Sequence, residues 1–183
     1  MKTAKALLSF LMFVAFNLAG VVSGRAESSP TFKVGEFTFT RPSAWEWVEV
    51  SSPMRKAQLK VKDADGKESA DIVFFQFGGG AGSTQANVDR WLGQFQEPRD
   101  KINAKVDETT VGKTKITYVQ AEGTYKSGMP GGPLTPMPDY GLLGAIIQSD
   151  AGDVFVRMTG PKGLVKSSST EFKKMIESGL KKE

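Results

Sequence analysis

The sequence contains no cysteine and no histidine. Disulfide bonds, thiol nucleophiles, zinc sites built from Cys and His, and Ser-His-Asp or Cys-His catalytic units are therefore excluded. A metal ion could be held only by carboxylates, carbonyls and hydroxyls, as calcium and magnesium are. An enzyme of this composition would need a carboxylate or a lysine as its base. The spacing of the carboxylates in the sequence does not place any two of them in the same pocket. We therefore expect a non-enzymatic protein with no catalytic residue, no metal site and no cofactor.

A basic start followed by an apolar run identifies the N-terminal segment as a secretory signal peptide. Two lysines precede the apolar residues 6–22, and small residues follow, which is the usual layout of such a segment. Cleavage after Ala26 would remove residues 1–26 and leave residues 27–183, which we expect to form one domain. The alternative is an uncleaved membrane anchor, but the run falls short of the ~20 apolar residues that a spanning helix needs. The sequence thus predicts an exported protein, periplasmic or extracellular, with no membrane span after cleavage.

The mature chain is expected to carry little net charge. The 183 residues include 24 basic and 20 acidic side chains, a formal net charge of +4. Three basic residues, Lys2, Lys5 and Arg25, leave with the predicted signal peptide, which lowers the net charge to +1. Nucleic-acid binding needs a basic surface, so we do not expect it. With 39% hydrophobic and 24% charged residues, the composition is that of a soluble globular domain held by a packed core.

Alternating and β-branched patterns predict that much of the chain forms β-sheet. Aromatic and β-branched residues at 32–39 and 45–50 predict two strands around a turn, and residues 57–62 alternate apolar with polar side chains. Residues 70–77 are apolar on both alternating faces, which is typical of a central strand. Further strands are expected at 104–110, 114–125, 140–149 and 153–159. Because short turns join successive strands, the sheet should be mainly antiparallel.

Two helices are predicted, one for each face of the sheet. Apolar residues recur at helical spacing over 84–96, which predicts a helix capped by Ser83 or Thr84. A capping-box pattern at Ser168–Glu171 precedes a second apolar stripe near the end of the chain. The expected fold class is therefore α+β: a mainly antiparallel β-sheet with one helix on each face, an α/β sandwich.

The order of these elements and several local sequences resemble PsbP-like domains. Phe37 to Trp45 reads Phe-Thr-Phe-x-x-Pro-x-x-Trp, and the later part of the chain combines Val154 to Arg157 and Gly160 with the run from Phe172 to Ser178. That fold is shared by the extrinsic PsbP subunit of photosystem II and by the Ran-binding Mog family of nuclear import factors. The resemblance implies an accessory or docking module rather than an enzyme. It transfers no functional residue, because the histidines implicated in metal binding in PsbP have no counterpart here and no Ran-binding motif is found.

A glycine-rich connection, Gly78 to Thr84, lies between the predicted central strand and the first helix. Glycines let a backbone approach a ligand closely, and a helix N-terminus offers free N–H groups to an anion. We therefore consider a small-anion or phosphate site formed by Gly79, Gly80, Gly82, Ser83, Thr84 and Arg90. A Walker A lysine and the last glycine of a dinucleotide fingerprint are both missing. The alternative is a tight strand-to-helix connection in which Ser83 or Thr84 acts only as a cap.

The second candidate site is the stretch from Lys126 to Asp139, which contains four prolines and three glycines and is expected to be a loop. Long loops often carry function, and methionine side chains adapt to irregular apolar surfaces. We expect contact with a protein partner through Met129, Pro130, Leu134, Met137 and Tyr140. The alternative is an elaborated strand connection without a role. The sequence as a whole thus predicts an exported binding or accessory module, with a small-anion-binding protein as the alternative function.

Overall fold

The computed structural model describes residues 30–50, 52–78, 81–128 and 131–180. The predicted signal peptide lies outside these ranges, as do four residues of the two candidate sites, namely Gly79, Gly80, Met129 and Pro130. Among the described helices, none combines the length and the apolar character needed to cross a membrane.

Seven antiparallel strands form the main sheet, in the spatial order β3-β4-β5-β9-β8-β7-β6. Their bounds are β3 Glu46–Trp47, β4 Arg55–Lys62, β5 Ser69–Gln76, β6 Lys105–Val111, β7 Thr114–Ser127, β8 Thr135–Ile147 and β9 Val154–Pro161. A separate hairpin precedes them, formed by β1 Thr31–Val34 and β2 Phe37–Thr40. The middle strands β5 and β9 are rich in β-branched and aromatic residues, which pack well on a sheet surface. The expectation of a mainly antiparallel sheet is confirmed.

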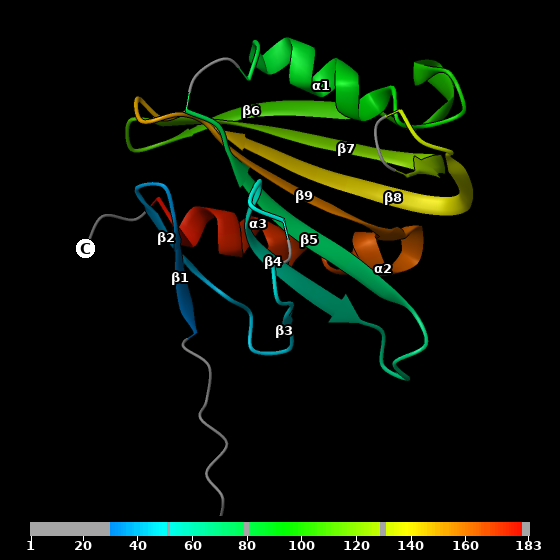
Figure 1. The fold of residues 1–183 in the computed structure, drawn as a ribbon, viewed down its shortest axis with the longest axis horizontal. Coiled ribbons are helices and arrows are strands. Elements are labelled where there is room, and N and C mark those ends of the chain that lie inside the picture. Colours follow the sequence, from blue (N-terminus) through cyan, green and yellow to red (C-terminus); the bar gives the residue numbers. More distant parts are fainter. Residues whose placement is uncertain (1–29, 51, 79–80, 129–130, 181–183) are drawn as a thin grey trace, which may run out of the picture.

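Helices cover both faces of the sheet (Figure 1). On one face, the apolar stripe of α1, Thr84–Leu92, packs against β7, β8 and β9. On the opposite face lie α2, Lys162–Ser167, and α3, Ser169–Ser178, together with the β1–β2 hairpin. A short 3₁₀ helix, η1 Arg99–Lys101, follows α1. The α+β fold class is thus confirmed, and α2 is an addition to the predicted pair of helices.

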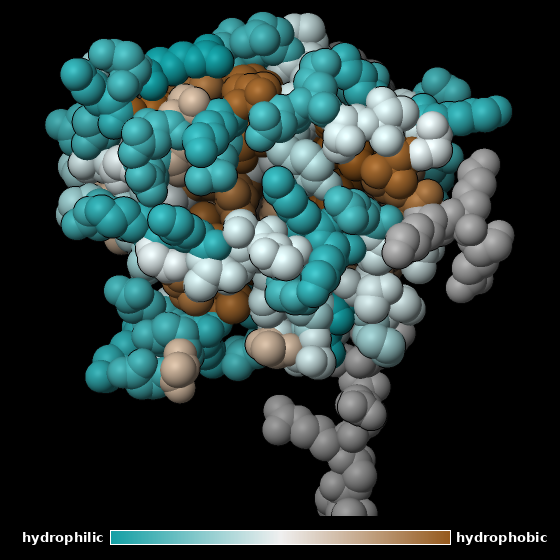
Figure 2. Space-filling model, turned by 180° about the vertical axis from the view of Figure 1, so that it is seen from behind, coloured by the Kyte–Doolittle hydropathy of each residue, from teal (hydrophilic) through white to brown (hydrophobic). Residues whose placement is uncertain are grey.

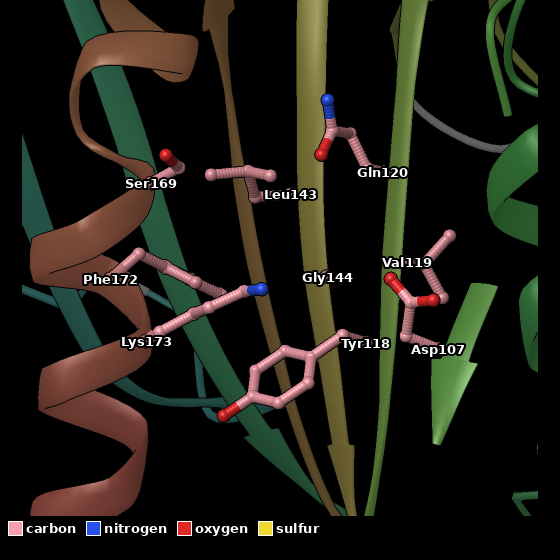
Figure 3. A pocket seen from close by; sticks show the side chains of 9 residues that line it. All are labelled: Asp107, Tyr118, Val119, Gln120, Leu143, Gly144, Ser169, Phe172 and Lys173. Atoms are coloured by element: carbon pink, nitrogen blue, oxygen red, sulfur yellow. The ribbon is translucent and has the colours of Figure 1, made fainter. Parts of the chain in front are cut away.

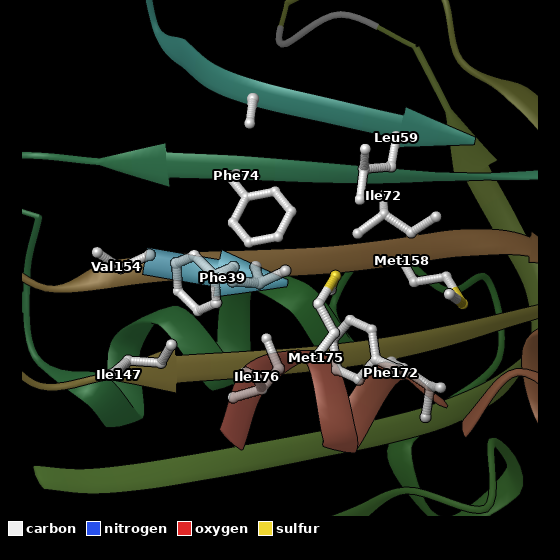
Figure 4. Close-up of a cluster of buried hydrophobic side chains, with 14 of the residues drawn as sticks. Phe39, Leu59, Ile72, Phe74, Ile147, Val154, Met158, Phe172, Met175 and Ile176 are labelled. Atoms are coloured by element: carbon white, nitrogen blue, oxygen red, sulfur yellow. The ribbon is translucent and has the colours of Figure 1, made fainter. Parts of the chain in front are cut away.

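Alternation along the strands divides the apolar side chains into two buried clusters, one on each face of the sheet. In β9, Val154, Val156 and Met158 belong to the cluster under α3, whereas Phe155 belongs to the cluster under α1. The larger cluster gathers Phe74 and the apolar side chains of α3 between the sheet and that helix (Figure 4). The smaller cluster extends from α1 to the base of the β7–β8 hairpin. The middle of the sheet is therefore buried from both sides.

The N-terminal strands differ from the sequence prediction. Residues 32–39 belong to the tight hairpin β1–β2 rather than to one strand, since Gly35 makes the turn with a φ of +61°, a conformation that glycine adopts without strain. Residues 45–50 contribute only the two-residue strand β3. The hairpin packs on α3 through Phe39, and the Thr40 N–H donates to Ser178 Oγ at 2.9 Å.

The first helix begins where the sequence predicts it and ends earlier. α1 starts at Thr84, with Ser83 as its N-cap. It ends at Leu92 rather than at Gln96 because Gly93 caps it, donating its N–H to carbonyls of the last turn. The chain then turns back toward β7, which places the residues after α1 at the base of the β7–β8 hairpin.

The predicted capping box at Ser168–Glu171 does not form. α2 runs directly into α3, so Ser168 has helical backbone angles, and its N–H already donates to the Leu164 carbonyl at 3.0 Å. Glu171 instead pairs with Lys174, at 2.8 Å. A capping box needs a non-helical residue with a free N–H, and the preceding helix removes both conditions.

Only part of the stretch from Lys126 to Asp139 is a loop, because residues 126–127 belong to β7 and residues 135–139 belong to β8. The β7–β8 ladder continues through the pairs Lys126–Pro136 and Ser127–Thr135. β9 pairs with β8 only as far as Tyr140, so no strand of the described residues adjoins the other edge of this extension. Proline is tolerated on such an edge because no partner there requires its missing N–H. The sequence prediction was wrong because it used proline content as evidence against a strand.

Candidate functional site

A buried asparagine ties the glycine-rich connection to α1. The Asn87 side chain, 3% exposed, donates to the carbonyls of Ala81 and Ser83, both at 2.9 Å. Gly82 has a φ of +81°, in the left-handed region that glycine favours. Ser83 Oγ accepts from the Ala86 N–H at 3.1 Å and so caps the helix. The described part of this connection is thus organised by contacts within the chain.

The other residues of the predicted anion site lie at the start and on the flank of α1. Arg90 Nη1 donates to Asn87 Oδ1 at 2.9 Å, and Thr84 Oγ1 accepts from Gln148 at 3.4 Å. Within the described ranges, no hydrogen bond joins Arg90 to Thr84. Asn87 connects the two regions, and sequence reasoning missed it because a polar residue early in a helix is usually solvent-exposed. An anion site at this connection stays a prediction.

The second predicted site lies on the extension of the β7–β8 hairpin, beside the C-terminal end of α1 (Figure 1). Leu134 is 52% exposed, whereas Met137 and Tyr140 are half-buried against the cluster under α1. The prolines around Leu134, namely Pro133, Pro136 and Pro138, are exposed. Among its described residues, the hairpin therefore presents one large apolar side chain to solvent near its turn.

Aromatic rings and one glutamine fix the base of this hairpin. Tyr125 stacks on Tyr140 with ring centroids 6.3 Å apart and meets Phe95 edge-on at 5.5 Å. Gln94 Oε1 accepts from the Tyr125 hydroxyl at 3.0 Å and from Arg157 Nη1 at 2.8 Å. Burial raises the pKa of Tyr125, against the opposing effect of the Arg157 charge. The hydroxyl therefore stays protonated as a donor at neutral pH.

A polar pocket of about 280 Å³ opens at the base of the same hairpin. It lies next to a β-bulge in β7 between Gly123 and Tyr125, and bulges often redirect side chains beside functional sites. Its charged and amide-bearing residues are Glu97, Lys101, Asn103, Glu122, Asp139 and Lys162. Sequence reasoning missed this pocket because its residues come from four separate segments. Of the lining residues, Pro138 and Asp139 lie within a stretch that the sequence singled out.

Glu97 holds the bulge in place. Its two carboxylate oxygens accept from the Thr124 N–H at 2.9 and 3.1 Å. Hydrogen bonding by Thr124 lowers the pKa of Glu97 from its ordinary value of 4.5. A side chain at Gly123 would place its Cβ 2.8 Å from Glu97 Oε2, so the glycine allows the carboxylate to approach the strand.

A Glu97→Gln variant should be less stable than the parent protein at about pH 7, and the difference should shrink toward about pH 3. Because the folded-state pKa of Glu97 is lowered, its carboxylate contributes stability above the unfolded-state pKa, and this contribution is lost as the pH falls through the folded-state pKa. Urea unfolding followed by circular dichroism at both pH values measures the difference. Glu49→Gln, at an exposed position after β3, is the control. A difference of equal size at both pH values would contradict this role of the carboxylate.

A smaller cavity lies between α3 and the β6–β7–β8 side of the sheet (Figure 3). Its volume of about 20 Å³ is enough for one water molecule. The Lys173 ammonium lies over the Tyr118 ring, 5.3 Å from its centroid. Burial, and then the charge of Glu177, raise the pKa of Tyr118 to about 12. The cavity is too small for a metabolite and is best described as a packing defect beside this cation–π contact.

The described residues offer no cluster of three or more Asp and Glu side chains that could hold a metal ion. The three carboxylates of the polar pocket are each held by a nitrogen donor: Glu97 by Thr124, Glu122 by Asn103 and Asp139 by Lys162. The pocket therefore combines fixed negative and positive groups, an arrangement suited to binding a polar ligand.

Comparison with known proteins gives a structural likeness only. No protein-family model matches the chain, and no curated protein is significantly similar to it in sequence. The solution structure of cyanobacterial PsbP (CyanoP) from Synechocystis sp. PCC 6803 superposes with a TM-score of 0.51 at 10% sequence identity. The match covers 87% of this chain and 96% of that chain. The protein therefore has a PsbP-like fold, as the resemblance in sequence implied.

Proposed function

We propose that the protein is an exported, non-enzymatic binding module that docks on a protein partner through the β7–β8 hairpin. The exposed Leu134 carries the proposal, because it lies on an extension whose base is fixed by Tyr125 and Tyr140. Burying a leucine side chain in a partner gains about 1.5–3 kcal/mol. A rigid base lets the protein make that contact without first ordering the hairpin.

Leu134 is not the most exposed large apolar side chain among the described residues, since Met54 is 62% exposed. Large exposed apolar side chains within the described ranges are Met54, Phe77, Val106 and Leu134. Seen from behind, hydrophilic side chains cover much of the molecule, and hydrophobic atoms appear between them in separate patches (Figure 2). Single apolar side chains are common on soluble proteins. The position of Leu134 on an extension, and not its exposure alone, distinguishes it.

The prolines of the extension support the same role. Pro133, Pro136 and Pro138 flank Leu134 and Met137, and each proline ring restricts φ to a narrow range. A segment that is already restricted loses less conformational entropy when a partner binds it. The prolines that made this stretch resemble a loop in the sequence therefore favour binding in the folded protein.

The ionisable groups support binding rather than catalysis. The pKa of Glu97 is lowered, and those of Lys162, Tyr118 and Tyr125 are raised. Each shift moves the pKa of the group further from pH 7, whereas a general acid or base works best with a pKa near the operating pH. The PsbP-like fold is compatible with an accessory role, although a fold alone does not define a function.

Site-specific photo-crosslinking tests the proposal. A photoreactive amino acid at position 134 should give one predominant cross-linked species with exported proteins of the source cells. The matched control carries the same group at Lys113, in the exposed turn at the other end of β7, and should not give that species. Unlabelled parent protein should compete for the cross-link, whereas a Leu134→Asp variant should compete about tenfold less well, because a buried aspartate would lose its hydration. Equal cross-linking at both positions, or equal competition by the two proteins, would refute docking through Leu134.

A further inference from the structure

The polar pocket beside the β-bulge has the size of a small-metabolite site. Its volume is about 280 Å³, just below the range of roughly 300–1,000 Å³ that drug-sized ligands occupy. Four segments meet there: the residues around η1, the bulge in β7, the outer part of β8 and the start of α2. A molecule of the size of an amino acid would contact several of these segments at once.

The pocket contains fixed groups of both charges. Lys162 Nζ donates to Asp139 Oδ1 at 2.6 Å, and Asn103 Nδ2 donates to Glu122 Oε1 at 2.6 Å. In the described chain these contacts use one oxygen of each carboxylate, so Asp139 Oδ2 and Glu122 Oε2 remain available to a ligand. Lys162 keeps two further N–H donors, and Lys101 has only a distant contact with Asp100, at 3.9 Å. The pocket therefore has both unused hydrogen-bond acceptors and unused hydrogen-bond donors.

Two residues that line the pocket have an uncommon backbone conformation with a positive φ. Asn103 and Asp139, with φ of +48° and +57°, are the residues other than glycine that have a positive φ in the described ranges. Both line the pocket. Their side chains hold Glu122 and Lys162, respectively. Uncommon backbone conformations persist where the surrounding structure over-determines them, often at ligand sites. Glu122 and Lys162 are thus positioned before any ligand arrives.

We infer that this pocket binds a small zwitterion of the amino-acid type, with an ammonium and a carboxylate on one molecule. The free oxygens of Glu122 and Asp139 would accept from the ammonium. Lys101 and Lys162 would donate to the carboxylate. A simple anion would meet three carboxylates, a simple cation would meet two ammonium groups, and an apolar molecule would desolvate all of them without compensation. A zwitterion matches both sets of charges, and this site is separate from the hairpin turn proposed to dock a protein.

Calorimetric titration of the mature protein tests the inference. The probes are L-serine, L-threonine, L-asparagine and L-glutamine, each added alone. At least one of them should bind, whereas its N-acetyl derivative, without the ammonium, and its carboxamide, without the carboxylate, should each bind at least about tenfold more weakly, a loss of about 1.4 kcal/mol. Absence of binding by all four probes at ~10 mM, or equal binding of the modified forms, would overturn the inference.

Two pairs of variants locate the site. Glu122→Gln and Lys101→Met should each weaken binding of the best probe by about tenfold or more, because a charge-assisted hydrogen bond is lost. Glu108→Gln and Lys113→Met, exposed residues outside the pocket, should leave the affinity unchanged. If all four variants bind equally well, the zwitterion binds elsewhere and the assignment of this pocket is wrong.

A glycine substitution separates the role of the Asn103 side chain from that of its backbone. Asn103→Gly retains access to a positive φ but removes the amide that holds Glu122. It should therefore weaken probe binding while leaving the melting temperature close to that of the parent. Unchanged binding would show that the orientation of Glu122 is irrelevant. Leu134→Asp should not alter probe binding, so failure of the docking proposal and failure of this one can be told apart.

Discussion

Replacing Phe74 by alanine is expected to lower the free energy of unfolding by about 3–5 kcal/mol. The Phe74 side chain is 0% exposed. Its ring lies in the cluster between the sheet and α3 (Figure 4), 5.0 Å from Phe32 and 5.2 Å from Phe39, measured between centroids. Removal of the ring leaves a cavity between two layers that cannot fully collapse, because the strands are held in register. Urea unfolding monitored by circular dichroism gives the change.

Phe77→Ala is the matched control, since this phenylalanine follows β5 but is 38% exposed. It stacks on Phe75 with centroids 6.2 Å apart, so the loss should be no more than about 1 kcal/mol, near that of other partly exposed sites. Similar losses for Phe74→Ala and Phe77→Ala would contradict the placement of Phe74 at the centre of the core. The comparison keeps the chemical change constant and varies only the burial of the ring.

Replacing Gly144 by alanine is expected to destabilise the opposite face by about 1–3 kcal/mol, the usual range for overpacking. Gly144 lies in β8 directly below Trp91 of α1, and an added Cβ would come within 2.6 Å of Trp91 Cε3. The indole, which is 6% exposed, cannot move without lifting α1 from the sheet. The absence of a side chain at Gly144 is therefore what allows the helix to pack here.

Displacement of α1 should also weaken the support of the β7–β8 hairpin. The segment after α1 supports it, because the Lys126 N–H donates to the Gln94 carbonyl at 2.8 Å. Gly144→Ala should therefore speed hydrogen exchange of the Lys126 amide, because local opening becomes easier when its packing is weakened. A variant with lower stability but unchanged exchange at Lys126 would show that the hairpin is independent of α1.

Gly163→Ala is the control for the glycine substitution. Gly163 lies in the first turn of α2, and an added Cβ would have no atom within 4 Å. Alanine is favoured over glycine by up to about 1 kcal/mol within a helix, so this variant should be at least as stable as the parent. Equal destabilisation by Gly144→Ala and Gly163→Ala would mean that contact with Trp91 is not the cause of the predicted effect.

Local patterns in the sequence predicted the elements whose signals do not depend on distant neighbours. The apolar character of both faces of residues 70–77 identified β5 as a central strand, and it does lie between β4 and β9. The apolar spacing before Pro98, with Ser83 or Thr84 as the expected cap, identified α1, and the structure has Ser83 as the cap. These features follow from the period of a strand or a helix and from side chains a few residues apart. For the same reason, the fold class and the PsbP-like arrangement could be stated before the structure.

The predictions that failed depend on the neighbours of each pattern, either the adjoining element or a strand elsewhere in the chain. The serine at 168 carries a capping signal, but the helix that precedes it makes the cap unnecessary. The prolines after Lys126 indicate a loop, but the open edge beside β8 accepts them in a strand. The end of α1 was predicted too late because Phe95 continues the apolar helical spacing. In the structure, Phe95 lies beyond the helix and forms a β-bridge with Tyr125.

The sequence by itself determined the chemistry that this protein cannot perform with Cys or His, the antiparallel sheet and the two buried faces, whereas the signal peptide stays a prediction. Composition and short-range periodicity are properties of the chain alone, so they can be read without coordinates. Only the tertiary structure decided which polar groups share a pocket. Glu97, Glu122 and Lys162 meet because strand pairing and a bulge bring separate segments together, and no local pattern encodes that meeting.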